Sequence, residues 1–326
     1  MRGSFRTIVS VLVTAAMVVV VAPANAQTYP AKPVRIISDS APGSAVDVTV
    51  RIVAEGLGKL WGQQVVTANH PGAGGAISAR VASEAAPDGY TFYMPALSVF
   101  LPSPGRAANL PLMVPRDFIP VGFATLQPMF IGASAKLGIT SLADLIARAK
   151  KQPGELSYAV TGVGRLTHLT GELLQMRAGI KLLMVPYSGG PNHALADVIG
   201  GRVPLVIEGY AGLASGFQGG GLKALATGAG KRLPDFPDLP AVAETLPGFN
   251  AVGWQVLVAP VGTPAAIVDK VSADLRTVMS QKEVQAILAK RGSYAQPMTA
   301  AQTLAFIHAE QKQWDPVFKQ LKFDKK

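Results

Sequence analysis

The 326-residue chain lacks cysteine altogether and has few charged residues, which make up 15% of the sequence. Without cysteine the protein forms no disulfide and has no thiolate nucleophile or zinc–thiolate site. Patterns for a nucleophile elbow, a Walker loop, a dinucleotide fingerprint and a zinc-binding HExxH helix are missing as well. Only four histidines are present. We therefore expect no catalytic residues, no metal site and no cofactor.

Long apolar runs are also missing beyond the N-terminus. Residues 8–22 are almost wholly apolar, but this run of roughly 15 residues is short of the ~20 that a bilayer crossing needs. Arg2 and Arg6 precede the run, and Ala24, Asn25 and Ala26 follow it. This order of basic, apolar and small residues is typical of a secretory signal peptide. The sequence predicts cleavage before Gln27 and a mature protein in the periplasm.

The formal net charge is +10, which raises nucleic acid or an anionic membrane as partners. The positive residues are scattered, however, and their densest groups have no aromatic residues between them. Such groups are typical of solvated surfaces. We expect no nucleic-acid partner and a small-molecule ligand instead.

Short apolar runs alternate with amphipathic helical stretches, which is the pattern of an α/β protein. Strands are expected at residues 34–37, 64–68, 91–96, 156–161, 183–186, 203–207, 222–226 and 254–259, and helices at 47–61, 77–86, 141–150, 167–178, 192–199 and from 264 to about 279. Thr263, Ser141, Ser280 and Thr299 are candidate helix caps, and the last two fit capping boxes with Glu283 and Gln302.

The order of these elements predicts two lobes. Two β-α-β-α-β blocks are followed by a returning strand and final helices, so the chain crosses between lobes near Ala124 and returns near Ala251. The expected division is a signal peptide at residues 1–26, lobe 1 at 27–123 plus 252–326, and lobe 2 at 124–251. Two crossing segments form a hinge that suits rigid-body closure over a ligand.

Three glycine-containing loops follow predicted strands, at residues 38–45, 161–168 and 186–190. In open α/β sheets, ligands bind at the carboxyl ends of strands, where loops lead into helix N-termini. Exposed backbone amides there attract anions and other acceptor groups. Glycine allows these amides to approach a ligand without a side chain in the way. The three loops are the candidate binding surface.

The same loops belong to a larger set of matching stretches, spaced along the chain from residue 29 to 264. The stretches are 29–35 (YPAKPVR), 42–47 (PGSAVD), 69–75 (NHPGAGG), 86–91 (APDGYT), 168–172 (HLTGE), 185–187 (VPY), 237–240 (PDLP) with Glu244, and 257–264 (LVAPVGTP). In these motifs the chain resembles the Bug family of periplasmic receptors, the TctC-like component of tripartite tricarboxylate transporters.

The resemblance implies a two-lobed periplasmic binding protein of type II, a Venus flytrap without catalysis. It also implies small carboxylates as ligands, membrane subunits of a tripartite tricarboxylate-type transporter as partners, and a monomer. A carboxylate would meet the loop after the first strand, and the lobe 2 loop would complete the clamp. The candidate ligand-binding residues are Asp39, Ser40, Gly43, Ser44, Ala45, Asp47, Ser98, Thr161, Gly162, Arg165, Thr167, His168, Ser188 and Glu208.

The chain departs from the family pattern in the first loop. Asp39 and Ser40 stand where the family has proline and phenylalanine, and Ser44 stands where it has a second glycine. An acid there repels a carboxylate at short range. Arg165 stands where the family usually has a small residue. We expect a ligand that directs a donor group toward Asp39 and at most one carboxylate toward Arg165.

Several side chains have two interpretations. Asp47 either stabilises a helix N-terminus or contacts ligand, and Arg165 is either an anion clamp or a solvated loop residue. Glu208 pairs with Arg165 or meets a donor on the ligand. His168 and Glu172 lie four apart on one helical face, but two ligands are too few for a metal site, and we expect His168 to be a hydrogen-bonding residue beside the pocket. Trp254 either packs in the core or stacks on ligand.

Two other functions use the same features differently. The binding fold also serves as a ligand sensor in signalling systems, and a neighbouring gene for a permease or a sensor kinase discriminates the two roles. An exported hydrolase is the remaining alternative. Such an enzyme needs one of the four histidines beside a serine and an acid, and the sequence offers no such arrangement.

Overall fold

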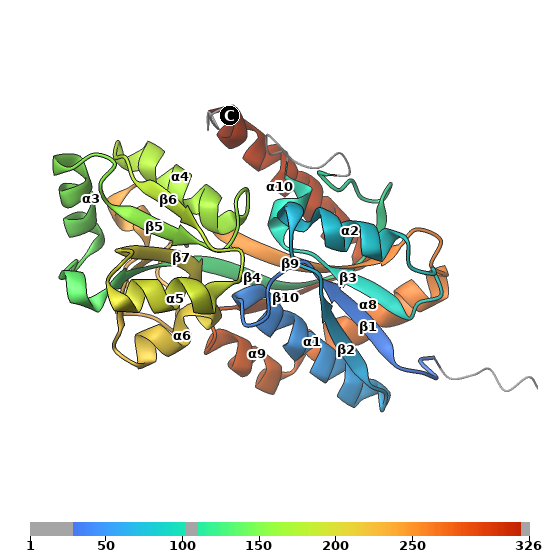
Figure 1. Ribbon diagram of the computed structural model, residues 1–326. Helices are drawn as coiled ribbons and strands as arrows, with labels where there is room; N and C mark the ends of the chain where they lie inside the picture. The colour runs from blue at the N-terminus through green and yellow to red at the C-terminus, as the bar shows by residue number, and fades with distance from the viewer. Residues whose placement is uncertain (1–28, 102–109, 321–326) are drawn as a thin grey trace, which may run out of the picture.

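The computed structural model describes residues 29–101 and 110–320, which form a two-lobed α/β protein (Figure 1). The predicted signal peptide and its cleavage site before Gln27 lie outside these residues. Within the described ranges, none of the helices combines the length and apolar character that a bilayer crossing requires.

The sheet of lobe 1 begins with three parallel strands in the order β2-β1-β3 and continues to β9, which is antiparallel to β3. The first half of β4 pairs with β9, and β10 pairs with β4 at the same end. Buried branched and aromatic side chains explain why β1, β3, β4 and β9 form strands. The strands of this sheet are β1 (Val34–Ser38), β2 (Val65–Asn69), β3 (Thr91–Met94), β4 (Phe118–Ser134), β9 (Val252–Pro260) and β10 (Tyr294–Met298).

The sheet of lobe 2 is built on the second half of β4. There β4 pairs with β7 and β8, both antiparallel, and the order β7-β5-β6 continues with parallel strands. The strands are β5 (Ser157–Val160), β6 (Leu183–Pro186), β7 (Leu205–Gly209) and β8 (Leu222–Thr227).

Strand β4 therefore belongs to both sheets. Its partner changes from β9 to β7 between Pro128, opposite Val252, and Met129, opposite Gly209. The predicted boundary between residues 123 and 124 lies a few residues earlier in this strand. It stays a prediction, as does the return at residues 251–252.

Helices cover both faces of each sheet (Figure 1). On one face, lobe 1 is covered by α2 and α10, and lobe 2 by α3 and α4. On the other face, lobe 1 is covered by α1, α8 and α9, and lobe 2 by α5 and α6. The helices are α1 (Ala45–Trp61), α2 (Ala76–Ser83), α3 (Leu142–Lys151), α4 (Leu166–Ala178), α5 (Pro191–Gly200), α6 (Tyr210–Gln218), α7 (Val242–Thr245), α8 (Ala265–Ser280), α9 (Lys282–Ala289) and α10 (Ala300–Gln320), and the 3₁₀ turns are η1 (Ala73–Gly75), η2 (Leu97–Phe100) and η3 (Ala135–Leu137).

The two faces bury their apolar side chains differently. On the α4 and α10 face, one continuous cluster runs through both lobes and includes Trp254, Leu169 and Ile307. On the opposite face each lobe has its own cluster, with Val53 in one and Val198 in the other. Burial of this apolar surface is the main favourable term in folding.

The predicted caps have mixed outcomes. Ser141 caps α3 through Asp144, and Thr299 forms a reciprocal capping box with Gln302, as predicted. The box from Ser280 is wrong, because Ser280 is still the last residue of α8 and its backbone is helical, so Gln281 occupies the cap of α9. Thr263 is not a cap either, since its hydroxyl donates to the carbonyl of Pro260 and Pro264 holds the cap position.

Candidate functional site

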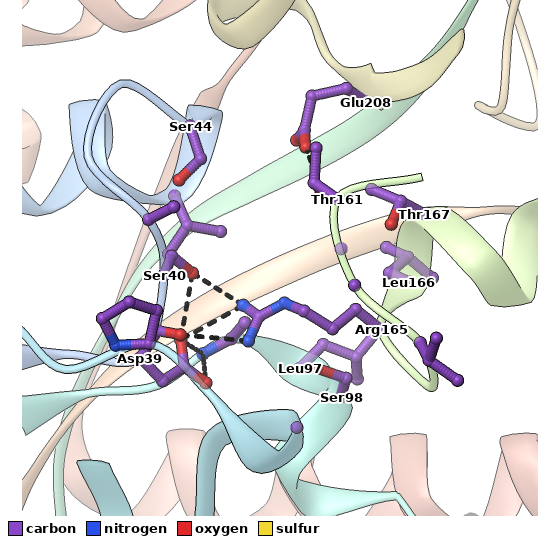
Figure 2. A pocket seen from close by; sticks show the side chains of 18 of the residues that line it. Asp39, Ser40, Ser44, Leu97, Ser98, Thr161, Arg165, Leu166, Thr167 and Glu208 are labelled. Atoms are coloured by element: carbon purple, nitrogen blue, oxygen red, sulfur yellow. Dashed lines mark hydrogen bonds and ion pairs between the residues drawn. The ribbon is translucent and has the colours of Figure 1, made fainter. Parts of the chain in front are cut away.

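A cavity of about 320 Å³ lies where loops of the two lobes face each other (Figure 2). Lobe 1 contributes the loops after β1 and β2 together with η2, and lobe 2 contributes the loop into α4 and the end of β7. Side chains from β4 and β9 lie between these groups. The lining residues are Asp39, Ser40, Ala41, Ser44, Val46, Pro71, Gly72, Ala73, Gly74, Ala96, Leu97, Ser98, Gln127, Met129, Thr161, Gly162, Val163, Arg165, Leu166, Thr167, Ser188, Glu208, Gly253 and Trp254.

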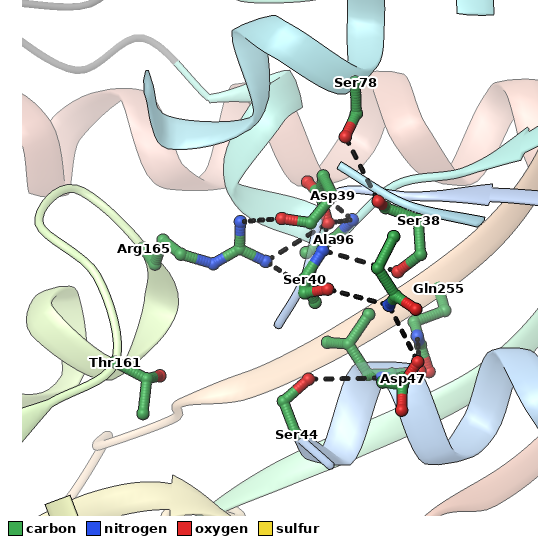
Figure 3. Close-up of polar contacts among 12 residues, drawn as sticks. Ser38, Asp39, Ser40, Ser44, Asp47, Ser78, Ala96, Thr161, Arg165 and Gln255 are labelled. Carbon is green, nitrogen blue, oxygen red and sulfur yellow. Dashed lines mark hydrogen bonds and ion pairs between the residues drawn. The ribbon is translucent and has the colours of Figure 1, made fainter. Parts of the chain in front are cut away.

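Asp47 fixes the loop between β1 and α1 (Figure 3). Its carboxylate accepts hydrogen bonds from the amide of Gly43 at 2.9 Å, from Nε of Arg51 at 2.9 Å and from Nδ2 of Asn69 at 2.8 Å. Its own amide donates to the hydroxyl of Ser44, the N-cap of α1. Asp47 does not line the cavity, and these hydrogen bonds give it a structural role in the loop.

Asp39 is buried at the base of the cavity, with its side chain 0% exposed. Its carboxylate accepts from the amide of Ala96 at 3.3 Å and from the hydroxyl of Ser40 at 3.0 Å. Gly75 packs behind it, where an added Cβ would lie 2.9 Å from Oδ2 of Asp39. The carboxylate is therefore held in one place by lobe 1 itself.

Arg165 reaches across from lobe 2 to this carboxylate. Its Nη2 donates to Oδ1 of Asp39 at 3.2 Å and to the hydroxyl of Ser40 at 2.6 Å, and its Nη1 donates to the carbonyl of Asp39 at 3.1 Å. Burial alone lowers the pKa of the guanidinium, but the charge and hydrogen bond of Asp39, together with the charges of Tyr93 and Glu208, outweigh burial and leave that pKa raised. Arg165 is thus neither a solvated residue nor a partner of Glu208 at bonding distance. It links the two lobes.

Gly162 makes room for this reach. An added Cβ at Gly162 would lie 2.6 Å from Cδ of Arg165, so the arginine stem folds directly over the glycine. The predicted glycine loop therefore positions a side chain across the cavity.

Glu208 occupies the opposite side of the cavity, at the end of β7. Its Oε2 accepts from the hydroxyl of Thr161 at 2.6 Å, and its Oε1 accepts from the amide of Gly209 at 2.9 Å. Burial raises the pKa of Glu208, and these two hydrogen bonds and the charge of Arg165 offset only part of that effect.

Two hydroxyl groups in the cavity wall lack a partner. Ser98 from lobe 1 is 1% exposed and Thr167 from lobe 2 is 5% exposed, and neither hydroxyl forms a hydrogen bond within residues 29–101 and 110–320. Thr167 lies in the first turn of α4, which no side chain of the described protein caps. The first amides of a helix have no partner inside the helix. Polar groups left in this state are suited to a bound solute.

His168 lies in α4 behind the cavity wall. Its Nδ1 accepts from the amide of Gly164 at 3.0 Å, and its Nε2 lies 3.7 Å from Glu172. Burial lowers the pKa of this imidazole, against the opposing effect of Glu172. The described residues contain no group of three or more side chains that would hold a metal ion.

Most of the predicted site residues come together in this cavity. Asp39, Ser40, Ser44, Ser98, Thr161, Gly162, Arg165, Thr167, Ser188 and Glu208 line it, whereas Gly43, Ala45, Asp47 and His168 do not. Gly43 and Asp47 hold the first loop, and Ala45 packs against Gly209. Their contact with a ligand stays a prediction, as it does for the lining residues.

Part of the lining was not predicted from the sequence, namely Gln127 and Met129 of β4, Gly253 of β9 and the loop after β2. Gln127, Met129 and Gly253 lie where β4 changes partner, and only the strand pairing brings them to the cavity. The loop at residues 71–74 was recognisable from its glycines. Trp254 packs against Phe100, with ring centroids 5.1 Å apart, and also lines the cavity.

Comparisons of the sequence and of the structure with known proteins all find transporter receptors and periplasmic binding proteins. The sequence profile described as the tripartite tricarboxylate transporter family receptor, TctC, matches residues 49–323. BugT of Bordetella pertussis is 34% identical over 304 residues, which cover 92% of this chain and 93% of BugT. The structure of the periplasmic binding protein BugD is 30% identical, with a TM-score of 0.82 over 90% of this chain and 98% of that chain. An R. palustris protein solved with adipate is 28% identical, with a TM-score of 0.85 over the same shares.

Proposed function

Because the chain belongs to the family of tripartite tricarboxylate transporter receptors, we propose that it delivers a small polar, carboxylate-bearing solute to the membrane subunits of such a transporter. It is a solute-binding protein of the type found in the periplasm, rather than an enzyme. The mature protein begins at Gln27 in this proposal and acts in the periplasm as a monomer. Its lobes are residues 27–123 with 252–326, and residues 124–251.

The cavity between the lobes is the observation that carries the proposal. It is lined from both lobes, and it contains buried hydroxyls of Ser98 and Thr167 that lack a partner among the described residues. Closing two lobes over a solute gives those groups partners and removes the solute from water. The related R. palustris protein was solved with adipate, which supports a carboxylate-bearing solute.

The test is ligand binding by the mature protein, residues 27–326. In a thermal-shift screen of carboxylates, amides and amino acids, at least one compound is expected to raise the melting temperature, since a ligand at 100 times its Kd adds about 2.7 kcal/mol of stability. Calorimetry then gives the affinity of each hit. No stabilisation by any compound would contradict the proposal.

A matched pair of variants ties that binding to the cavity. Thr167→Val removes a hydroxyl that has no partner in the described part of the chain, so we expect a loss of about 1 kcal/mol in binding free energy with little change in stability. Thr170→Val is the control, because this threonine lies in the same helix but does not line the cavity, and its hydroxyl donates to the carbonyl of Leu166 within the helix. Equal affinity in the Thr167 variant and the unmodified protein would show that the solute binds elsewhere.

A further inference from the structure

The described lining of the cavity has two acidic side chains and one basic side chain, and only one of the acids forms an ion pair with the base. Among residues 29–101 and 110–320, three charged side chains line it, namely Asp39, Arg165 and Glu208. Arg165, the cation of these three, already contacts a carboxylate of the protein, since it lies 3.2 Å from Asp39 and has a side chain only 14% exposed. Its charge is therefore largely neutralised before any solute enters.

Once Asp39 and Arg165 are paired, Glu208 is the charged side chain of the described lining that has no ion-pair partner. Its oxygens accept from the Thr161 hydroxyl and the Gly209 amide, which are neutral donors, and no cation of the described chain forms an ion pair with it. Glu208 is 4% exposed. A buried carboxylate without a cation is costly unless further donors reach it. A solute that brings such a donor supplies what this end of the cavity lacks.

The other unpartnered groups in the wall carry no charge. The hydroxyls of Ser98 and Thr167 donate or accept as required, and the uncapped start of α4 offers amides and the positive end of the helix dipole. These groups suit one acceptor, such as a single carboxylate or an amide oxygen. They supply no full positive charge for a second carboxylate.

We propose that the cavity selects a solute of zero net charge whose nitrogen donor, either the ammonium of a zwitterion or a primary amide, binds at Glu208. Its acceptor end binds beside Thr167 and Ser98 at the start of α4, and dicarboxylates are excluded. This inference rests on the proposed function and names the class of solute for the same site. Because Asp39 already neutralises Arg165, the solute does not need a second carboxylate to pair with this arginine.

Two matched series of compounds test the proposal on the unmodified mature protein. The four-carbon series is succinate, succinamate, γ-aminobutyrate and succinamide, and the six-carbon series is adipate, adipamate, ε-aminocaproate and adipamide. Within a series the carbon chain is constant while the net charge changes. We expect the zwitterion or the diamide to bind at least about tenfold more tightly than the dicarboxylate, because the dicarboxylate meets Glu208 at short range. Calorimetry measures each affinity.

Variants then assign the preference to Glu208. Glu208→Gln should narrow the difference in affinity between the zwitterion and the dicarboxylate of each series. Glu55→Gln, which removes the same charge from the exposed surface of α1, should leave the difference unchanged. Preferential binding of succinate or adipate by the unmodified protein would overturn this inference and leave the proposed function standing. Failure of both series would also overturn it, and the proposed function would fail only if the wider screen found no ligand.

Discussion

Glu208 is a carboxylate whose protonation is coupled to folding. Burial raises its pKa, so the folded protein holds this proton more tightly than the unfolded chain does. The contribution of the group to stability is fully present below the pKa of the unfolded chain, which is about 4.3 for glutamate. It is lost as the pH rises through the raised pKa of the folded state.

Glu208→Gln should therefore remove a pH-dependent loss of stability. The variant resembles the protonated carboxyl, so its free energy of unfolding is expected to match that of the unmodified protein near pH 4 and to exceed it increasingly toward pH 8. Urea unfolding across this range measures the difference. Glu55→Gln, at an exposed position, should show no such trend. A difference that is constant with pH would contradict the assignment.

Residue identities predicted much of the cavity lining but not the pairing of its charges. Asp39, Arg165 and Glu208 were predicted at the cleft from their loops, and all three line the cavity. From the sequence, Asp39 was expected to meet a donor on the solute, and Glu208 was a possible partner for Arg165. The structure pairs Arg165 with Asp39, 126 positions away. Such a pair depends on how two lobes face each other, which local spacing does not report.

At the scale of elements, the ends of β7 and α1 come unusually close. An added Cβ at Gly209 would lie 2.5 Å from Cβ of Ala45, so the end of a lobe 2 strand rests on the start of a lobe 1 helix. The backbone of Gly209 has a φ of −65° and a ψ of 150°, which alanine adopts without strain. Glycine is therefore required at position 209 because of the close contact with Ala45, and not because of its backbone conformation.

Gly209→Ala should hold the lobes apart. We expect the affinity for the best compound of the screen to fall about tenfold or more, because overpacking a tight contact costs about 1–3 kcal/mol. Gly230→Ala is the control, since nothing lies within 4 Å of an added Cβ there. If both variants bind as the unmodified protein does, this contact does not limit closure.

The order of most strands and helices followed from periodicity, whereas some bounds, the strands β4 and β10 and the helix α6 did not. The predicted strand at residues 203–207 lies at Leu205–Gly209 in the structure, because its pairing with β4 extends to Gly209 opposite Met129. Strand β10 (Tyr294–Met298) was not predicted. It is short, contains Pro297 and exposes part of its residues, so its pairing with β4 and not its composition makes it a strand.

At the scale of the whole molecule, the Asp39–Arg165 pair joins the two lobes directly across the cavity. Opening the cleft separates these charges and exposes both to water. The pair therefore favours the closed arrangement even without a solute. Removing one member leaves the other charge buried and unpaired, which is costly in a closed protein.

Arg165→Met should consequently open the ligand-free protein. The methionine keeps an apolar stem but no charge, and Asp39 then gains solvation only when the lobes separate. Small-angle X-ray scattering is expected to show a larger radius of gyration than in the unmodified protein. The single change should also lower the free energy of unfolding by about 3 kcal/mol.

The double change Asp39→Asn with Arg165→Met is the control for that experiment. Because it removes both charges, we expect it to recover part of the stability that the single change loses. A single variant that keeps both the compactness and the stability of the unmodified protein would show that the pair contributes nothing to closure.

The continuous strand β4 also sets the order in which the growing chain completes its sheets. The second half of β4 pairs with β7 and β8, which follow in the middle of the sequence, whereas its first half waits for β9 and β10 near the C-terminus. Lobe 2 is thus able to finish its sheet while the N-terminal strands of lobe 1 still lack their neighbours. Until the last quarter of the chain arrives, half of β4 presents an unpaired edge, which is the kind of surface that chaperones protect and aggregates recruit.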